Sequence, residues 1–183
     1  MRILSYSLFL LGLALLVPMA RSSAGEFKLE AGFKLLFNGK NFDGWQPKGK
    51  KDALAGKTEV GRFKVADGTV HMNSAVKGES YLETAHEFSG DVHIKFDFKP
   101  GPKCNNDFFL RGIKFDVVPG NKECKNVKAT DWNTLEIIAK GDTVEHKING
   151  ELARKSTKKA ETTRFIMRAE TGEITVKNIR VKE

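Results

Sequence analysis

Residues 92–98 read VHIKFDF, and this segment decides the fold class of the chain. Four apolar side chains alternate in it with His93, Lys95 and Asp97. Strict alternation over this length predicts a β-strand that is buried on one face and polar on the other. Such a strand needs neighbours from elsewhere in the chain to complete a sheet.

Candidate neighbours lie on both sides of this segment. Asn149-Gly150 and Asp67-Gly68 predict tight hairpins, because the central residues of such turns take positive φ values. The first turn joins strands expected at 143–148 and 151–153, and the second joins 62–66 to 70–72. Further strands are expected at 81–84, at 132–139, across 108–117 with a bulge at Gly112, and as a pair at 164–169 and 174–181 around Thr171-Gly172.

No stretch of the sequence carries a capped helical period over three turns. Seven or more short strands with closely spaced turns predict two antiparallel sheets packed as a sandwich or jelly roll. The 183 residues fit one domain, and no repeat or linker divides them. The expected fold is therefore an all-β jelly-roll sandwich.

The first 24 residues have the features of an export signal. Arg2 precedes an apolar run at residues 3–17, and Ser22 and Ala24 lie three residues and one residue before a cleavage point after Ala24, in the usual small-residue pattern. The run is about 15 residues long, whereas a membrane-spanning helix needs about 20. We expect residues 1–24 to be a cleaved signal peptide, residues 25–183 to form a single domain without a transmembrane anchor, and the protein to be secreted or periplasmic.

The net charge of the chain permits an acidic partner but does not require one. The chain has 31 Lys and Arg against 23 Asp and Glu, which gives a formal net charge of +8. Basic clusters at residues 48–51 and 154–159 lack the interleaved aromatic residues that stack on nucleic-acid bases. We expect solvated loops there, with contact to an acidic polysaccharide as the alternative, and no nucleic-acid partner. The oligomeric state stays open.

Cys104 and Cys124 are the two cysteines of the chain. In an exported protein an even pair is typical of a disulfide, which would stabilise a loop of about 20 residues by on the order of 3 kcal/mol. Metal ligation is the weaker alternative, because no histidine lies nearby in the sequence. We expect a disulfide between Cys104 and Cys124.

Residues 105–111 read NNDFFLR and contain the first candidate site. Asn105, Asp107 and Arg111 share a parity, so along an unbroken strand their side chains face one way. An amide, a carboxylate and a guanidinium together suit a hydroxyl-rich ligand. The alternative is an exposed Asp–Arg ion pair that contributes little to stability.

Histidine and tryptophan add two weaker candidates. His93 lies on the polar side of the strand at residues 92–98 and can point into a concave face. Trp132 and Trp45 are either core residues or flat platforms for sugar rings.

The opening GFKLLFNGKNFDGW at residues 32–45 resembles the start of the 3-keto-disaccharide hydrolase domain family, also described as 3-keto-glucoside lyase or hydratase. Further family-like motifs follow in the same order at residues 63–68, 81–84, 105–111, 131–133, 148–150 and 177–181. The resemblance implies a concanavalin A-like jelly roll and activity on 3-keto-glucosides. A ketone at C3 acidifies the C2 proton, so this chemistry needs a general base and an electrophile, for which a divalent metal ion is a candidate.

The chain departs from the family pattern after Arg111. Lys114 stands where the family has Glu, Asp116 where it has Gln, and Asn106-Asp107 where it has Ser-Gly. We expect Asp116 or Asp107 to act as base and Arg111 to hold a substrate oxygen or an enolate. The expected substrate-binding residues are Asn105, Lys114, His93 and Trp132.

Three functions remain open on the sequence alone. The first is a secreted carbohydrate-active enzyme that acts on 3-keto-glucosides or related glycosides by hydrolysis or elimination. The second is a glycan-binding domain that has lost catalysis, because Lys114 replaces the family Glu. The third is a basic interaction protein of the cell envelope.

Overall fold

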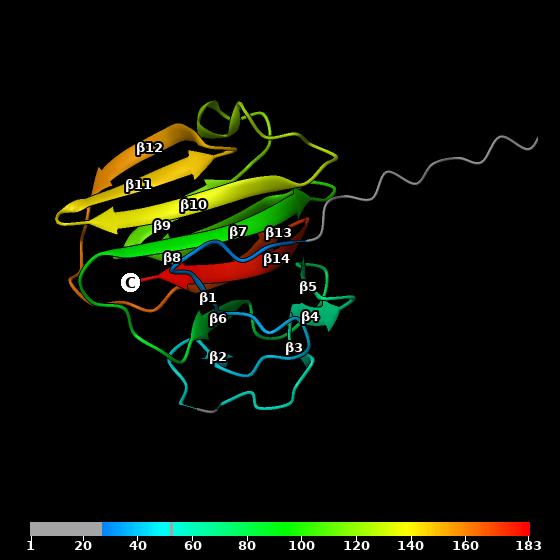
Figure 1. Cartoon of the computed structure of the whole chain (residues 1–183). Coiled ribbons are helices and arrows are strands. Elements are labelled where there is room, and N and C mark those ends of the chain that lie inside the picture. Colours follow the sequence, from blue (N-terminus) through cyan, green and yellow to red (C-terminus); the bar gives the residue numbers. More distant parts are fainter. Residues whose placement is uncertain (1–26, 52) are drawn as a thin grey trace, which may run out of the picture.

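The structure is a computed structural model that describes residues 27–51 and 53–183. Its strands form two antiparallel sheets packed face to face, which makes the molecule a concanavalin A-like jelly-roll sandwich (Figure 1). The segment expected to be a signal peptide, residues 1–24, lies outside the described residues.

The larger sheet contains nine strands. Its central strand β7 (Val92–Pro100) includes the segment VHIKFDF. In spatial order the sheet runs through β12 (Glu151–Thr157), β11 (Thr143–Ile148), β10 (Asn133–Lys140), β7, β14 (Glu173–Lys182), β5 (Thr69–Asn73), β4 (Phe63–Ala66) and β3 (Glu59–Val60), and β1 (Lys34–Leu35) pairs with β14.

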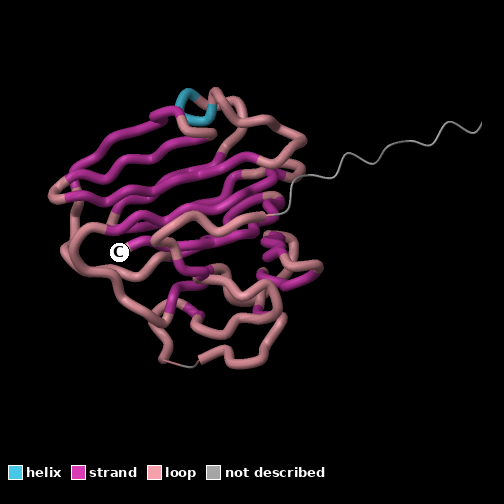
Figure 2. The backbone as a smooth tube through the Cα atoms, in the orientation of Figure 1, coloured by secondary structure: helices cyan, strands magenta, loops and turns pink. Residues whose placement is uncertain are grey.

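The smaller sheet contains five strands. In spatial order they are β2 (Trp45–Pro47), β6 (Tyr81–Thr84), β13 (Ile166–Thr171), β8 (Asn105–Leu110) and β9 (Ile113–Val117). Within the described part of the chain the helical structure is one short 3-10 turn, η1 (Lys122–Cys124), visible in Figure 2, so no described helix has the length to cross a membrane.

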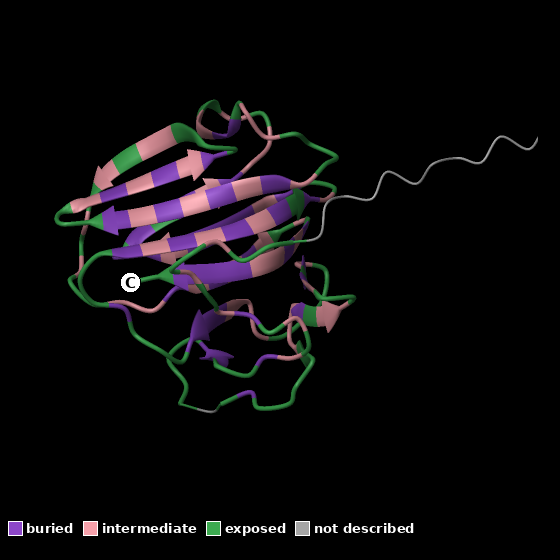
Figure 3. Cartoon of the chain, viewed as in Figure 1, coloured by how far each residue is buried: buried purple, intermediate pink, exposed green. Residues whose placement is uncertain are grey.

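Aromatic side chains from both sheets fill the core between them. On β7, buried and partly exposed residues alternate, as the bands on this strand and its neighbours show in Figure 3. The ring of Phe96 lies 4.6 Å from that of Phe108, and Phe165 stacks on Phe108 at 6.3 Å. Trp45 is also a core residue, and its indole N–H donates to the carbonyl of Leu36. The inner face of each sheet is therefore fixed, and every residue of opposite parity on these strands faces outward.

The chain reverses where a bulge was expected at Gly112. Arg111 and Gly112 both take positive φ values, 52° and 70°, and form the two-residue turn between β8 and β9. This conformation is typical of tight hairpins. The expected continuous strand over 108–117 is thus a hairpin.

The expected strand pair around Thr171-Gly172 is also wrong. β13 belongs to the smaller sheet and β14 to the larger one, so Gly172 marks a crossing between the sheets. Gly172 has a φ of 67°, and a Cβ atom there would lie 2.2 Å from the carbonyl oxygen of Lys103. A glycine is needed because the backbones pass so closely.

Candidate functional site

The outer face of the smaller sheet carries two rows of polar and aromatic side chains. Antiparallel pairing places Tyr81, Arg168, Asp107 and Asp116 directly opposite one another, across β6, β13, β8 and β9. The neighbouring row contains Glu83, Ile166, Phe109 and Lys114 on the same four strands. Phe108 and Leu110 point into the core. The odd-numbered residues of β8, which alternate with them, therefore face outward.

Three carboxylates meet at the first row, because Glu170 lies two residues after Arg168 on β13. Oxygen atoms of Asp107, Asp116 and Glu170 lie within 4.8 Å of one another. The ammonium of Lys114 is 2.5 Å from Asp116 Oδ1 and 3.9 Å from Asp107 Oδ1. The guanidinium of Arg168 is 2.9 Å from Asp107 Oδ2 and 3.0 Å from Glu170 Oε2. We refer to these five residues as the acidic cluster.

The two aspartates differ in environment and in pKa. The side chain of Asp107 is fully buried, and its Oδ1 atom has no hydrogen-bond partner. Burial, followed by the adjacent Asp116 and Glu170, raises the pKa of Asp107 to about 7. Burial also acts to raise the pKa of Asp116, but contacts with Asp107 and Lys114 outweigh it and lower that pKa. Below about pH 7 the pair therefore shares one proton, which resides mainly on Asp107.

An aromatic surface adjoins the acidic cluster. The rings of Tyr81 and Phe109 lie 6.4 Å apart on neighbouring outward positions, and both side chains are half-buried. The guanidinium of Arg168 lies 5.3 Å from the ring centre of Tyr81. Two carboxylates with opposite pKa shifts, two cations and an aromatic surface thus share one face.

The acidic cluster also has the oxygen donors that hard divalent cations prefer. Asp107, Asp116 and Glu170 are the residues that would hold such an ion. Lys114 and Arg168 already place positive charge on these oxygens, so a metal ion would compete with the ammonium of Lys114.

Four of the residues expected from the sequence share this face. Asp107, Lys114 and Asp116 belong to the acidic cluster, and Asn105 lies two positions before Asp107 on β8 with the same parity. The side-chain oxygen of Asn105 is buried without a partner.

Arg111 lies elsewhere. It occupies the turn after β8, and its side chain is 2% exposed. Its guanidinium donates to the carbonyl oxygens of Phe88 at 2.7 Å and Gly90 at 2.5 Å. The expected common face of Asn105, Asp107 and Arg111 is wrong, because the strand ends before Arg111 and the turn redirects its side chain.

His93 and Trp132 do not reach the acidic cluster. His93 is on the outer face of the larger sheet, where its ring is 2.9 Å from a carboxylate oxygen of Glu136. Trp132 immediately precedes β10, and the ammonium of Lys177 on β14 lies 3.9 Å from its ring centre. The expectation that His93 binds one substrate together with Asn105 is wrong, because the two residues lie on the outer faces of different sheets, with the core between them.

The expected disulfide is also absent. Cys104 and Cys124 are both buried free thiols. Their sulfur atoms lie 3.4 Å from the carbonyl oxygens of Val117 and Asp116, respectively, at the end of β9. Burial raises the pKa of both thiols, to about 11 for Cys104. Each thiol therefore satisfies a strand carbonyl instead of bonding to the other.

This face also contains four residues that were not expected from the sequence: Arg168, Glu170, Tyr81 and Phe109. Arg168 and Glu170 alternate with the buried Met167 and Ala169 on β13. This alternation marks them as outward-facing, but their meeting with Asp107 depends on which strands are neighbours.

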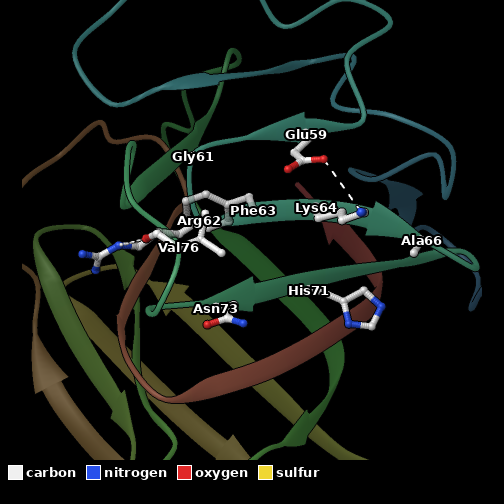
Figure 4. A pocket seen from close by; sticks show the side chains of 9 residues that line it. All are labelled: Glu59, Gly61, Arg62, Phe63, Lys64, Ala66, His71, Asn73 and Val76. Atoms are coloured by element: carbon white, nitrogen blue, oxygen red, sulfur yellow. Dashed lines mark hydrogen bonds and ion pairs between the residues drawn. The ribbon is translucent and has the colours of Figure 1, made fainter.

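A separate hollow of about 330 Å³ lies at the far edge of the larger sheet (Figure 4). It is lined by residues of β3, β4 and β5 and the adjoining loops, including Glu59, Lys64, His71 and Asn73. The lining contains no expected site residue, and its one carboxylate, Glu59, pairs with Lys64 at 3.8 Å. This hollow shares no lining residue with the acidic cluster and is a separate feature of the surface.

Known structures share this architecture. Two provisionally assigned glycosyl hydrolases from Parabacteroides distasonis have TM-scores of 0.67 and 0.63 and sequence identities of 19% and 14%. The matches cover 82% of this chain in both cases and 93% and 98% of the other chains. The carbohydrate-binding module CBM66 from Bacillus subtilis matches with a TM-score of 0.54 and 12% identity, covering 78% of this chain and 97% of the module. No curated protein matches the chain significantly. At these identities the matches establish the fold alone.

A protein-family model matches most of this chain. The model described as a 3-keto-alpha-glucoside-1,2-lyase-like domain matches residues 32–123 and 116–182. These segments include every motif on which the sequence resemblance rests, from the GFKLLFNGKNFDGW opening to residues 177–181 on β14. The chain therefore belongs to the family of 3-keto-alpha-glucoside-1,2-lyase-like domains.

Proposed function

We propose that the protein acts on 3-keto-glucosides at the outer face of the smaller sheet. Family membership supports the class of reaction. The observation that carries the proposal is the acidic cluster, in which two aspartates with opposite pKa shifts lie between two cations. Pairs of this kind are typical of acid–base catalysis.

The proposed reaction is an elimination. A base removes the proton from C2 of the sugar, which the neighbouring C3 ketone acidifies. The electron pair passes through the enolate and expels the C1 oxygen, which takes the abstracted proton back from the base and leaves as the aglycone alcohol. The products are the alcohol and a 1,2-unsaturated 3-keto sugar, to which water can then add. A positive charge near the C3 oxygen lowers the barrier, because charge develops there in the transition state.

Each residue of the acidic cluster has a place in this scheme. Asp116 is the base, because it is ionised and 29% of its side chain is exposed. Asp107 lies behind it and holds the proton that keeps Asp116 oriented. Lys114 and Arg168 provide the positive charge for the enolate. Outside the cluster, Asn105 serves to hydrogen-bond a sugar hydroxyl.

The test is release of aglycone from a 3-keto-glucoside by the purified protein. Asp116→Asn should lower kcat by about 100-fold or more, the usual contribution of a positioned base. Glu136→Gln is the matched control, because this carboxylate also pairs with a cationic side chain but lies on the opposite face. Equal activity in both variants would contradict the role of Asp116 as base. Release from an unoxidised glucoside at the same rate would contradict the keto-dependent reaction.

A non-catalytic glycan-binding domain is the second candidate. One observation favours it: with one proton on the aspartate pair, the five ionisable groups of the acidic cluster balance in charge. Lys114 also stands where the family has Glu. Binding of a 3-keto-glucoside without any product would support this candidate over the enzyme.

Export is proposed on the sequence of residues 1–24. Amino-terminal sequencing of the protein from its native host should find Gly25 as the first residue. An intact Met1 in material outside the cytoplasm would contradict the cleavage site.

A further inference from the structure

The sandwich has an open side where the edge strands of the two sheets meet. β9 ends the smaller sheet and β12 ends the larger one. Between them is a hollow of about 340 Å³. Its lining residues are Ile113, Lys114, Arg154, Ser156, Thr157 and Lys159. We call this the β9–β12 hollow.

Every ionisable side chain that lines the β9–β12 hollow is basic. They are Lys114, Arg154 and Lys159, of which Lys114 has its ammonium paired with Asp116, and no described carboxylate lines the hollow. Ser156 and Thr157 add two hydroxyl groups. A concave surface with this composition is complementary to an anion that also carries hydrogen-bonding oxygens.

Lys159 and Arg154 differ in the contacts that they already make with the protein. Lys159 is exposed, and among the described residues no carboxylate pairs with it. Arg154 is held in place, since it pairs with Glu123 at 3.1 Å, donates to the carbonyl of Lys114 and lies over the ring of Phe115. Its Nε atom is buried and has no hydrogen-bond partner among the described residues. A fixed guanidinium loses little entropy when it binds an anion.

The β9–β12 hollow is continuous with the acidic cluster. Lys114 belongs to both, because it lines the hollow and its ammonium contacts Asp116. A sugar unit bound at Asp116 therefore has the β9–β12 hollow beside it, toward the edge of the sheet.

We infer that the β9–β12 hollow is an anion subsite, and that it binds a carboxylate or sulfate group on a sugar next to the 3-keto unit. The role next to a reacting sugar rests on the proposed function, whereas anion binding itself does not. The solvated loop expected at residues 154–159 is wrong for residues 154–157, which belong to β12, and the segment contributes Arg154 and Lys159 to the lining of the hollow.

Binding can be tested without any reaction. Sodium glucuronate, glucose 6-sulfate, inorganic sulfate and glucose are titrated into the purified full chain, with calorimetry as the readout. At least one acidic sugar should bind about tenfold more tightly than glucose, which corresponds to one charge-assisted hydrogen bond. That preference should shrink as salt rises from about 0.02 M to 0.3 M. Equal binding of glucose and both acidic sugars would overturn the inference, and binding of sulfate alone would mark an adventitious ion only.

Two lysine variants on β12 and its extension decide where the anion binds. Lys159→Gln should weaken acidic-sugar binding about tenfold. Lys155→Gln makes the same change in net charge, but Lys155 is outside the β9–β12 hollow and pairs with Glu145 at 3.1 Å. It should bind like the unchanged protein. Equal losses in the two variants would show a general charge effect and overturn the site.

Turnover separates this inference from the proposed function. The comparison uses two 3-keto-glucosides that differ only in a carboxylate on the leaving group. The acidic substrate should have a KM about tenfold lower, and Lys159→Gln should remove that difference. Equal KM values with normal turnover would overturn the subsite and leave the function intact. No turnover of either substrate, with glucuronate still bound through Lys159, would overturn the function and leave anion binding intact.

Discussion

Arg111 connects four segments of the chain around one hairpin turn. Its side chain donates to the carbonyls of Phe88 and Gly90, and its own amide donates to the hydroxyl of Thr163. Its carbonyl in turn accepts from the amide of Lys159. A charged side chain that is 2% exposed is tolerated there because its donors meet carbonyl oxygens.

Replacing Arg111 should therefore change stability more than chemistry. Arg111→Met keeps the length of the side chain but leaves the carbonyls of Phe88 and Gly90 without their donors. We expect a loss of about 3 kcal/mol in the free energy of unfolding, from two charge-assisted hydrogen bonds. Urea denaturation measures that loss, and turnover should fall only in proportion to the fraction unfolded.

Arg168→Met provides the contrasting substitution. Arg168 contacts Asp107 and Glu170 on the outer face, and its side chain is 28% exposed. The raised pKa of Asp107, about 7, keeps a proton on this carboxyl, so removing the guanidinium does not leave a buried charge alone and the cost in stability should be the smaller of the two. Turnover should fall in the folded protein. An Arg111→Met protein of normal stability that has lost turnover would instead place Arg111 in the chemistry.

The sequence predicts only part of the acidic cluster. The sequence predicts that Asp107, Lys114 and Asp116 face outward, since each of them alternates with core residues along its strand. The position of Arg111 was not, because an arginine with a φ of 52° gives no local signal of a turn. Arg168 and Glu170 join the cluster through the pairing of β13 with β8, which local alternation does not specify.

At the level of elements, Gly172 allows the chain to pass from one sheet to the other. β13 ends at Thr171 and β14 begins at Glu173, so one residue separates strands of different sheets. The backbone of Lys103 and Pro102 passes so close that a Cβ atom on Gly172 would lie 2.2 Å from Lys103 O and 2.4 Å from Pro102 O. The segment Pro102-Lys103 leads into β8 and Gly172 leads into β14, so relieving the clash would move one of these strands.

Gly172→Ala should therefore be severely destabilising. We expect a loss of more than about 3 kcal/mol, from backbone displacement added to positive-φ strain. Gly68→Ala is the matched control, because Gly68 has a similar φ of 73° but open space around the new Cβ. It should lose only about 1 kcal/mol. Thermal or urea unfolding of the two variants compares them, and equal losses would show that φ strain alone is responsible.

Strands with one buried face were predictable, and their pairing was less so. β7, β10 and β11 show the expected alternation, and the Asn149-Gly150 hairpin joins β11 to β12 as predicted. Alternation does not tell which sheet a strand joins, so residues 164–169 and 174–181 were wrongly paired. β1 and β3 contain two residues each, too few for any period to appear.

Across the whole molecule, two buried groups oppose each other in their response to pH. His146 lies in the core with its ring stacked 4.6 Å from Phe115, and neither ring nitrogen has a partner. Burial, with a smaller contribution from Arg154, lowers the pKa of His146 from 6.5 to about 3. Asp107 is shifted the other way, from 3.8 to about 7. Both groups are neutral in the folded protein across the interval between about 4 and 6.5.

The two groups contribute slopes of opposite sign in this interval. The unfolded chain binds more protons at His146 than the folded protein, so that group makes stability rise with pH from about 3 to 6.5. The folded protein binds more protons at Asp107, so that group makes stability fall as pH rises from 3.8 to about 7. Each slope is on the order of 1.4 kcal/mol per pH unit. In the unchanged protein they largely cancel.

Single variants should remove this cancellation. Asp107→Asn retains a neutral side chain beside Arg168 and leaves the His146 slope, so its free energy of unfolding should rise between about pH 4.5 and 6. His146→Leu leaves the Asp107 slope, so its free energy should fall over the same interval. The double variant should be nearly flat, like the unchanged protein. Urea unfolding at several pH values measures all four slopes. Parallel slopes in the two single variants would mean that other groups dominate the pH response, because the buried carboxyl and the buried imidazole require slopes of opposite sign.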